Sequence, residues 1–367
     1  MSATVADQGA ARPVLRVGVI GLGEVAQVVH LPVLASLPDL FEVRAVCDLS
    51  PTLVQQVGDA FGVPHRYATA TELIGAGDLD AVLVLNSDEY HTECAVEALE
   101  HGLHVLVEKP MCLSPREAER VIEARDRSQR TLMVGYMRRF APAFLEAKAL
   151  LPELGGITFA RVHDVIGRNQ LIVDQTSHVI RPTDLGRAAL EERWERGRRL
   201  VTEAIGDVPA PLAGAYRLLC GLGSHDLSAM RELLGPPAGV HAARMWRDGG
   251  WIAALLDYGD HVVSYETGVD EQVRFDAHLE VFGQHASLRV QYDTPYVRHL
   301  PTTLHVERTD GEALTRSVLR PHLKDPYTYE LEDFHACITT GRAPKTSAED
   351  FVADLDLFAE LVRHLQK

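Results

Sequence analysis

Three short segments carry residues that could act together in hydride transfer. A G-x-G-x-x-A run contains Gly21 and Gly23 at the spacing of a loop that holds the pyrophosphate of a dinucleotide. Lys109 supplies an ammonium group that can hold a substrate oxygen and stabilise negative charge developing on it. His225 supplies an imidazole whose ordinary pKa, about 6.5, suits proton transfer near neutral pH.

The glycine run follows a short β-branched segment, Leu15–Ile20, as a dinucleotide-binding loop must. Its glycines permit a tight turn and the close approach of a pyrophosphate to main-chain N–H groups. Asp48 ends the next strand-like run, where its carboxylate can accept hydrogen bonds from two ribose hydroxyls and would repel a 2′-phosphate. We therefore expect NAD in preference to NADP. The alternative is a glycine turn followed by an unrelated aspartate.

Polar clusters also follow two later strand-like runs, Ala81–Leu85 and His104–Val107. Because ligands bind at the carboxyl ends of parallel strands in open α/β sheets, both clusters are candidates for the cofactor site. Taken alone, Lys109 would be interpreted as an exposed loop lysine. The residues predicted to contact the cofactor are Gly21, Gly23, Glu24, Val25, Asp48, Asn86, Ser87, His91, Glu108, Lys109 and Arg139.

Alternating strands and helices must position these groups. The strand-like runs are nearly all apolar, which is typical of a parallel sheet covered on both faces. Helix starts lie between them: Ser50 precedes a proline, and Ser114 begins an S-x-x-E capping box. The pattern predicts a doubly wound α/β domain over residues 13–142, preceded by a flexible tail over residues 1–12.

After Pro142 the strand-like runs follow one another with short turns, as in a mostly antiparallel sheet. We expect an α+β domain for substrate binding and oligomerisation over residues 143–367, with closing helices over 327–367. Residues 167–212 interrupt this pattern and include a charged helical stretch, Leu185–Ile205. This insertion is either a solvated surface helix or a lid or subunit contact beside the active site.

The composition of the chain limits the classes of partner that we expect the protein to bind. The chain has 367 residues and a formal net charge of −16, which disfavours nucleic acid and anionic membrane surfaces as partners. Five scattered cysteines and a start without a basic n-region predict a cytoplasmic protein without a signal peptide. No run is long and apolar enough for a membrane helix, and no His/Cys spacing predicts a metal site.

The string AVLVLNSDEYHTECAVEALEHGLHVLVEKPMCLS closely resembles the signature of the glucose–fructose oxidoreductase/inositol dehydrogenase (Gfo/Idh/MocA) family. GLGEVAQVVHLP, VGYMRRFAPAF and YELEDFHACITTGRAPKTSAED are similar to further segments of that family. The resemblance implies a Rossmann domain, an open-sheet domain that supports homodimers or homotetramers, and sugar, cyclitol or related polyol substrates. It also implies that Lys109 is the catalytic lysine.

The segment around His225 resembles the family's D-x-G-x-H-x-x-D motif, whose histidine serves as proton acceptor. Here Gly221 stands in place of the usual aspartate, at the start of the predicted helix. Asp226 is a poor substitute for this aspartate, because it is about 100° around a helix from His225. Asp164 or an acidic residue of the insertion is the alternative substitute. We hold Asp164 and Asp226 as candidate substrate contacts. The simpler interpretation of His225 is a helix N-terminal histidine bonded to its own turn.

The function that follows is hydride transfer between NAD and a secondary alcohol or ketone of a polyhydroxylated small molecule. In this interpretation His225 takes the hydroxyl proton and Lys109 holds the oxygen. Arg139 either contacts substrate or cofactor or braces the junction of the two domains. Two other functions stay open: an NAD-dependent glycosidase or epimerase that uses transient oxidation, and a nucleotide-binding regulator that has lost the chemistry.

Overall fold

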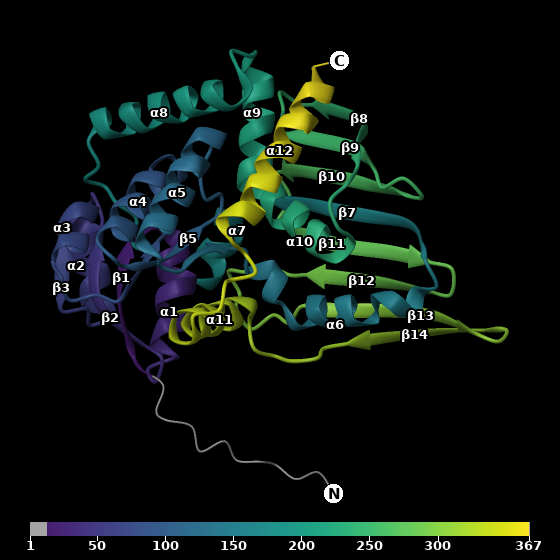
Figure 1. Cartoon of the computed structure of the whole chain (residues 1–367), viewed down its shortest axis with the longest axis horizontal. Helices are drawn as coiled ribbons and strands as arrows, with labels where there is room; N and C mark the ends of the chain where they lie inside the picture. Colours follow the sequence, from purple (N-terminus) through teal and green to yellow (C-terminus); the bar gives the residue numbers. More distant parts are fainter. Residues whose placement is uncertain (1–12, 367) are drawn as a thin grey trace, which may run out of the picture.

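The computed structural model describes residues 13–366; the tail predicted over residues 1–12 lies outside this range. Two β-sheets dominate the chain, one surrounded by helices and one with helices on a single face (Figure 1). The fold class expected from the sequence, a Rossmann domain followed by an α+β domain, is confirmed.

The first sheet has six parallel strands in the order β3-β2-β1-β4-β5-β6. The order reverses between β1 and β4, and this switch point is where open α/β sheets bind ligands. The strands are β1 (Leu15–Ile20), β2 (Phe41–Cys47), β3 (His65–Tyr67), β4 (Ala81–Val84), β5 (His104–Glu108) and β6 (Leu132–Gly135). The helices between them are η1 (Ala26–His30), α1 (Leu31–Ala35), α2 (Pro51–Ala60), α3 (Ala70–Gly75), η2 (Asp88–Tyr90), α4 (His91–Glu100) and α5 (Pro115–Ser128).

Two predicted helix starts are confirmed by their capping bonds. The Ser50 side chain accepts a hydrogen bond from the Leu53 N–H, and the Ser114 side chain accepts one from the Glu117 N–H. Each bond satisfies a main-chain donor that the first turn of a helix leaves without an intrahelical acceptor.

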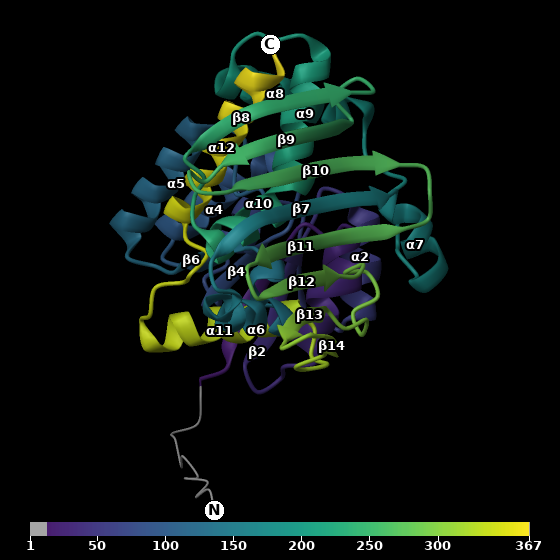
Figure 2. The same cartoon turned by 90° about the vertical axis from the view of Figure 1, so that its right-hand side faces the viewer.

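The second sheet has eight strands in the order β14-β13-β12-β11-β7-β10-β9-β8. Only the β7–β10 pair is parallel, so the predicted mostly antiparallel sheet is confirmed. The strands are β7 (Ile157–Gly167), β8 (Gly239–Trp246), β9 (Trp251–Asp257), β10 (Val262–Asp270), β11 (Phe275–Gly283), β12 (Ala286–Tyr292), β13 (Thr303–Asp310) and β14 (Ala313–Leu319). Figure 2 shows this sheet with helices behind it and one face largely open to the viewer.

The remaining helices are η3 (Met137–Phe140), α6 (Pro142–Leu150), η4 (Leu151–Leu154), α7 (Asn169–Thr176), α8 (Arg187–Ile205), α9 (Ala210–Leu218), η5 (Leu219–Gly223), α10 (Ser224–Leu234), α11 (Pro326–Thr340) and α12 (Ala348–Leu365). Among residues 13–366, no helix combines the length and the apolar character needed to cross a bilayer.

The last two helices tie the two sheets together. Leu331 and Phe334 of α11 share an apolar core with Val17 of β1 and Leu83 of β4. The His335 ring on the same helix lies 2.8 Å from the main-chain oxygen of Pro13. Helix α12 packs both against α5 and against β8. The dinucleotide-binding half of the molecule is therefore completed by residues from the end of the chain.

The segment around Gly221 does not start a helix, as the sequence suggested; it lies inside one. Helices α9 and α10 are joined through η5, a single π-helical turn with helical dihedral angles on both sides. Leu219 and Cys220 of this turn are fully buried. Burial on this scale outweighs the unfavourable helix propensity of a glycine, about 1 kcal/mol. π-turns of this kind often accompany functional sites.

The two glycines of this π-turn have different surroundings, which predicts different responses to alanine. A Cβ on Gly223 would lie 2.5 Å from the hydroxyl oxygen of Tyr265, a fully buried side chain of β10, whereas a Cβ on Gly221 meets nothing within 4 Å. We expect Gly223→Ala to destabilise the protein by about 1–3 kcal/mol through overpacking. The matched Gly221→Ala should be neutral or stabilising, by up to about 1 kcal/mol. Thermal unfolding measures both; equal melting temperatures would contradict the prediction.

Candidate functional site

The glycine loop is shaped to accept a pyrophosphate. Gly21 has a φ of +92°, and a Cβ there would lie 2.5 Å from the main-chain nitrogen of Asn86. Only glycine fits this position. A Cβ on Gly23 would meet nothing within 4 Å, so the space above the loop is open. A glycine turn at the switch point with open space above it is the cradle that a dinucleotide requires.

Asp48 is held at the carboxyl end of β2 by two main-chain donors. The Leu22 N–H donates to its Oδ2 and the Ser50 N–H to its Oδ1, each at 2.9 Å. These bonds fix the carboxylate beside the glycine loop, where it is half-buried and can still accept hydrogen bonds from a ribose. Glu24 and Val25, also predicted to contact the cofactor, lie half-buried directly after Gly23.

Lys109 reaches from the end of β5 across to the π-turn. Its Nζ donates a 2.6 Å hydrogen bond to the main-chain oxygen of Gly221. Burial lowers the pKa of this ammonium group, while the charges of Glu108 and Asp88 act in the opposite direction. The ammonium is thus held at the junction of the two halves of the chain, with Gly221 as its hydrogen-bond acceptor.

Glu108 supports this lysine from the Rossmann side. Its Oε1 lies 2.8 Å from Nε2 of His30, and its Oε2 accepts from the Lys109 N–H at 3.0 Å. Burial favours the neutral carboxyl, but the hydrogen bond and charge of His30, together with the Lys109 charge, outweigh it and lower the Glu108 pKa. A carboxylate kept ionised here stabilises the adjacent ammonium group.

His225 is on α10, one helical turn after Gly221, whose main-chain oxygen accepts the bond from Lys109. Burial lowers the pKa of its imidazole well below the ordinary value, and the positive charges of Lys109 and Arg138 lower it further. Its Nδ1 is buried and has no hydrogen-bond partner among the described residues. The simpler interpretation, a histidine bonded to its own helical turn, is therefore not what the structure shows. A neutral imidazole near an ammonium group can accept a proton from a hydroxyl that the ammonium holds.

The lowered pKa of His225 leads to a prediction about how activity depends on pH. Because the His225 pKa is depressed, the imidazole is neutral at and below neutral pH, and kcat/KM should change little as the pH falls from 7.5 towards the ordinary histidine value of about 6.5. Gly221→Asp would add a carboxylate one helical turn before His225, at a position where a Cβ meets no other atom within 4 Å. That carboxylate should raise the His225 pKa, so the variant should lose activity as the pH falls through the raised value.

Initial rates measured across this pH range test the prediction. Gly221→Asn is the matched control because it has the same size without the charge, and its profile should follow that of the wild type. A wild-type profile that falls steeply below pH 7, or identical profiles for the Asp and Asn variants, would contradict the prediction.

Arg138 is the residue that the sequence analysis missed. It follows β6 on η3 and is 3% exposed, and its Nη1 bonds to Asp164 Oδ2 at 2.9 Å and also to Asp226. Arg138 also stacks on Tyr292, with its guanidinium carbon 5.1 Å from the ring centroid. Its position after a strand of the Rossmann sheet was a signal, because the same rule identified the lysine cluster.

The contacts of Arg138 show that two acidic residues do not have the role expected from the sequence. Asp164 and Asp226 were candidate substrate contacts, but both are fully buried and paired with its guanidinium. Burial raises the Asp226 pKa well above its ordinary value. The Arg138 charge lowers this pKa, and the neighbouring Asp164 raises it. Asp164 therefore does not stand in for the missing aspartate at His225; it belongs to a buried ion cluster beneath the site.

Two further expected cofactor contacts have structural roles. The ring of His91 bridges two loops, with Nδ1 2.8 Å from Pro110 O and Nε2 3.0 Å from Asn86 O, which leaves no ring nitrogen for a ligand. Arg139 is 4% exposed and pairs with Glu232 of α10 and Asp350 of α12, so it links the segment after β6 to two helices of the second domain.

The other two residues of the Asn86 cluster remain at the edge of the cleft. Asn86 donates from Nδ2 to Cys94 Sγ at 3.4 Å, and its buried Oδ1 has no partner among the described residues. The Ser87 hydroxyl accepts a 3.4 Å hydrogen bond from Arg193 of α8. Both side chains are half-buried and keep polar atoms available to a ligand.

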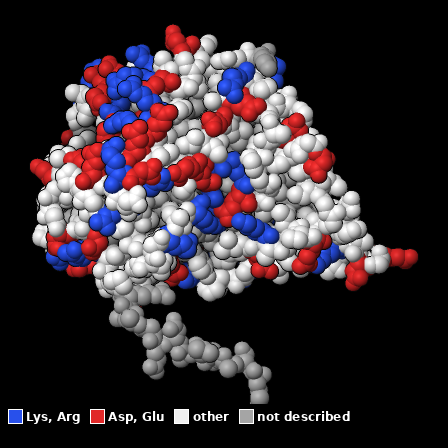
Figure 3. Space-filling model, viewed as in Figure 1, with Lys and Arg blue, Asp and Glu red and all other residues white. Residues whose placement is uncertain are grey.

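The insertion is docked on the Rossmann domain. Figure 1 shows α8 lying across α4 and α5, and Figure 3 shows basic and acidic side chains interleaved in this area. Arg196 of α8 donates to the main-chain oxygen of Glu89 at 2.6 Å. Its guanidinium also lies over the Tyr90 ring, 4.8 Å from the centroid. The helix is largely solvated, as the first interpretation held, but these contacts anchor it to η2, which follows β4.

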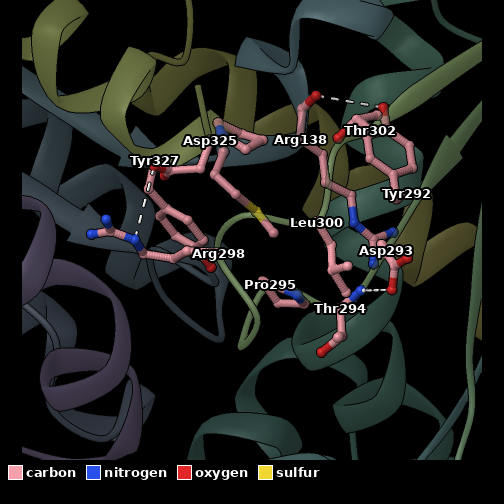
Figure 4. Close-up of a pocket in the computed structure, with 12 residues that line it drawn as sticks. Arg138, Tyr292, Asp293, Thr294, Pro295, Arg298, Leu300, Thr302, Asp325 and Tyr327 are labelled. Carbon is pink, nitrogen blue, oxygen red and sulfur yellow. Dashed lines mark hydrogen bonds and ion pairs between the residues drawn. The ribbon is translucent and has the colours of Figure 1, made fainter. Parts of the chain in front are cut away.

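A small pocket lies next to Arg138 and is lined by neither of the two proposed catalytic groups (Figure 4). Tyr292 donates a 3.4 Å hydrogen bond to Arg138 O in its wall, and Arg298 faces Asp325 at 4.0 Å. Because Lys109 and His225 are not among its lining residues, we do not assign this pocket to the substrate. Within residues 13–366, no group of three or more His, Cys, Asp or Glu side chains is arranged to hold a metal ion.

A Rossmann sheet with a glycine cradle is thus joined to an open-sheet domain, and the hydrogen bond from Lys109 to Gly221 links the two beside the end of β5. Residues 15–136 match the GFO_IDH_MocA family model, described as "Oxidoreductase family, NAD-binding Rossmann fold". Inositol 2-dehydrogenase of Salmonella typhimurium is 31% identical over 37% of this chain and 41% of its own length. Residues 15–136, which form the Rossmann domain, therefore belong to the Gfo/Idh/MocA family.

Longer matches agree with this assignment. Myo-inositol 2-dehydrogenase of Thermotoga maritima is 24% identical over 92% of both chains. A 3-ketoreductase from Actinomadura kijaniata, solved with NADP and TDP-benzene, superimposes with a TM-score of 0.72 over 96% of this chain and 97% of its own, at 22% identity. The stronger curated match with the Salmonella enzyme spans less than half of that relative.

Proposed function

We propose that the protein transfers hydride between NAD and a secondary alcohol or ketone of a sugar, cyclitol or related polyhydroxylated compound. The observation that carries this proposal is the 2.6 Å hydrogen bond from Lys109 Nζ to Gly221 O, which holds the ammonium group at the helical turn just before His225. The names of two relatives, inositol dehydrogenases, and of one structural neighbour, a 3-ketoreductase, support this substrate class.

In the proposed mechanism, the residues hold and move charge at the substrate oxygen. A nicotinamide dinucleotide held by Gly21, Gly23 and Asp48 would supply the hydride acceptor for oxidation of the alcohol and the hydride donor for reduction of the ketone. Lys109 exchanges its bond to Gly221 O for one to the substrate oxygen and stabilises negative charge there. His225, neutral because its pKa is depressed, takes the hydroxyl proton, and in the reverse direction it returns this proton.

We infer that NAD is the cofactor. Asp48 occupies the position from which a carboxylate bonds the ribose hydroxyls, and the next two residues, Leu49 and Ser50, carry no positive charge that could receive a 2′-phosphate. The NADP bound by the Actinomadura relative is a property of that protein, and direct comparison of the two cofactors decides the matter here.

We further propose a cytoplasmic homodimer or homotetramer that forms through the open face of the second sheet. This face carries exposed apolar side chains, among them Phe159, Trp246 and Leu255, at 37%, 44% and 44% exposure. Side chains of this size on an open sheet face are typical of an interface between protein chains. Light scattering coupled to size-exclusion chromatography measures the mass in solution; a monomer would refute this proposal.

A substrate screen tests the proposed function. Cyclitols, aldoses, amino sugars and glycosides are incubated with NAD or NADP while reduced nicotinamide is followed by absorbance, alongside His225→Ala. We expect turnover of at least one polyol class and a loss of about 100-fold or more in kcat/KM for the variant. An active substrate on which His225→Ala keeps full activity would refute the assigned role. Binding of NADH without turnover of any class would favour a regulatory protein.

A further inference from the structure

A segment of the insertion is bound both beside the glycine loop and at the loop that follows β2. We call residues 177–186, which join α7 to α8, the strap. At one end, the strap exchanges two hydrogen bonds with Gln27: Gln27 Nε2 donates to Ile180 O, and the Ile180 N–H donates to Gln27 Oε1, both at 2.9 Å. Gln27 also donates from Nε2 to Leu22 O at 2.8 Å, so this end is fixed to the glycine loop.

At its other end the strap is fixed to the loop that follows β2. Asp184 accepts a hydrogen bond from the Ser50 hydroxyl through Oδ1 and one from the Thr52 N–H, at 2.9 Å, through Oδ2. Ser50 also donates from its main-chain nitrogen to Asp48. One residue therefore holds two carboxylates: Asp48 from the Rossmann domain and Asp184 from the insertion.

The charge on Asp184 persists at all physiological pH values. Its bonds with Ser50 and Thr52 lower its pKa to about 2, and its side chain is exposed to solvent. The strap's arginine does not offset this charge at Ser50, because Arg181 pairs with Asp174 at 2.6 Å and lies 3.7 Å from Glu24. The loop after β2 thus presents two negative charges on the side from which a ribose approaches.

We propose that Asp184 is a specificity-determining residue that excludes NADP, because the strap places its carboxylate where the 2′-phosphate would lie. The ribose 2′-position of a bound dinucleotide faces the carboxylate that ends β2. A 2′-phosphate there would carry up to two negative charges against Asp48 and Asp184, whereas a 2′-hydroxyl can donate a hydrogen bond to either. This inference rests on the proposed function, that the cleft binds a nicotinamide dinucleotide.

The test measures cofactor affinity without turnover. NADH and NADPH are titrated into wild type, Asp184→Asn and Asp174→Asn, and the fluorescence of the reduced nicotinamide gives each Kd. Asp184→Asn removes the charge and keeps an oxygen to accept from the Thr52 N–H. We expect it to tighten NADPH binding about tenfold at low salt while the NADH affinity changes little. The Asp174→Asn control removes an equal charge from the residue that pairs with Arg181, and it should leave the ratio of the two Kd values within about twofold of wild type.

The outcomes separate this inference from the proposed function. The inference holds if Asp184→Asn raises the affinity for NADPH alone and if high salt reduces the preference of the wild type for NADH over NADPH. Asp184 then acts through its charge on the group at the ribose 2′-position. If both affinities fall together, Asp184 only supports the loop, and the inference is wrong. An unchanged ratio also overturns it. A wild type that binds neither dinucleotide would instead refute the proposed function itself.

Discussion

Replacing Lys109 by alanine should lower kcat/KM by about 100-fold to 1,000-fold, the loss usually seen when one group that stabilises a developing oxyanion is removed. The expected size follows from the surroundings of the ammonium group. Lys109 is half-buried, next to an ionised Glu108, and its donor points towards the π-turn and the neighbouring His225. In such a water-poor site a charge acts more strongly on a substrate oxygen than it would in bulk solvent.

The kinetics of the Lys109 variants should separate chemistry from binding. Lys109→Ala is expected to lower kcat more than it changes the affinity for NADH, because the ammonium group acts on the reacting oxygen. Lys109→Met, which keeps an unbranched apolar stem without the charge, serves as the matched control for lost packing and should be as inactive as the alanine variant. If Lys109→Met retained more than about a tenth of the wild-type kcat/KM, the charge would not be the cause.

Replacing Arg138 by methionine should destabilise the protein by about 3–5 kcal/mol, the usual effect of breaking a buried ion pair by removing one partner. The substitution would leave Asp164 and Asp226, both fully buried, without their common cation. Chemical denaturation followed by tryptophan fluorescence measures the loss. Arg138 also lies beside His225, so the variant should have reduced activity even at temperatures where it remains folded.

A double variant distinguishes charge from packing in this cluster. Arg138→Met combined with Asp226→Asn removes one cation and one potential anion, and it should recover part of the stability lost by Arg138→Met alone. Arg138→Lys keeps the charge but not the planar fork that reaches both carboxylates, so it should fall between wild type and Arg138→Met. If the double variant were no more stable than Arg138→Met, unpaired acidic groups would not be the cause of the loss, and the lost packing of Arg138 on Tyr292 would explain it instead.

The Rossmann half was predictable because its signals are local. The glycine loop, the end of β2 and the lysine after β5 each follow an apolar strand, and a single rule places ligands at such ends. The second sheet was predicted less completely. β14 was missed because it is an edge strand that is almost entirely exposed, so its residues lack the alternation that indicates a half-buried strand.

The parts of the site that could not be predicted depend on contacts between distant segments. Nothing near Asp184 in the sequence indicates that it meets Ser50, which lies in another domain. Arg138 and Arg139 are adjacent, and only the turn of η3 decides which of them faces the ion cluster beneath the site. The sequence predicted that a helix starts at Gly221, but the burial of Leu219 and Cys220 keeps the segment before it helical as well.

The packing of α11 on the first sheet has a consequence for how the protein is made. A ribosome releases β1 and β4 long before residues 326–340, yet Leu331 and Phe334 of that late segment fill the apolar surface that Val17 and Leu83 present. During synthesis this surface has no native cover until almost the whole chain has emerged. The nascent Rossmann half should therefore be exposed to chaperones and proteases for most of translation, and it should reach its final stability only when α11 docks.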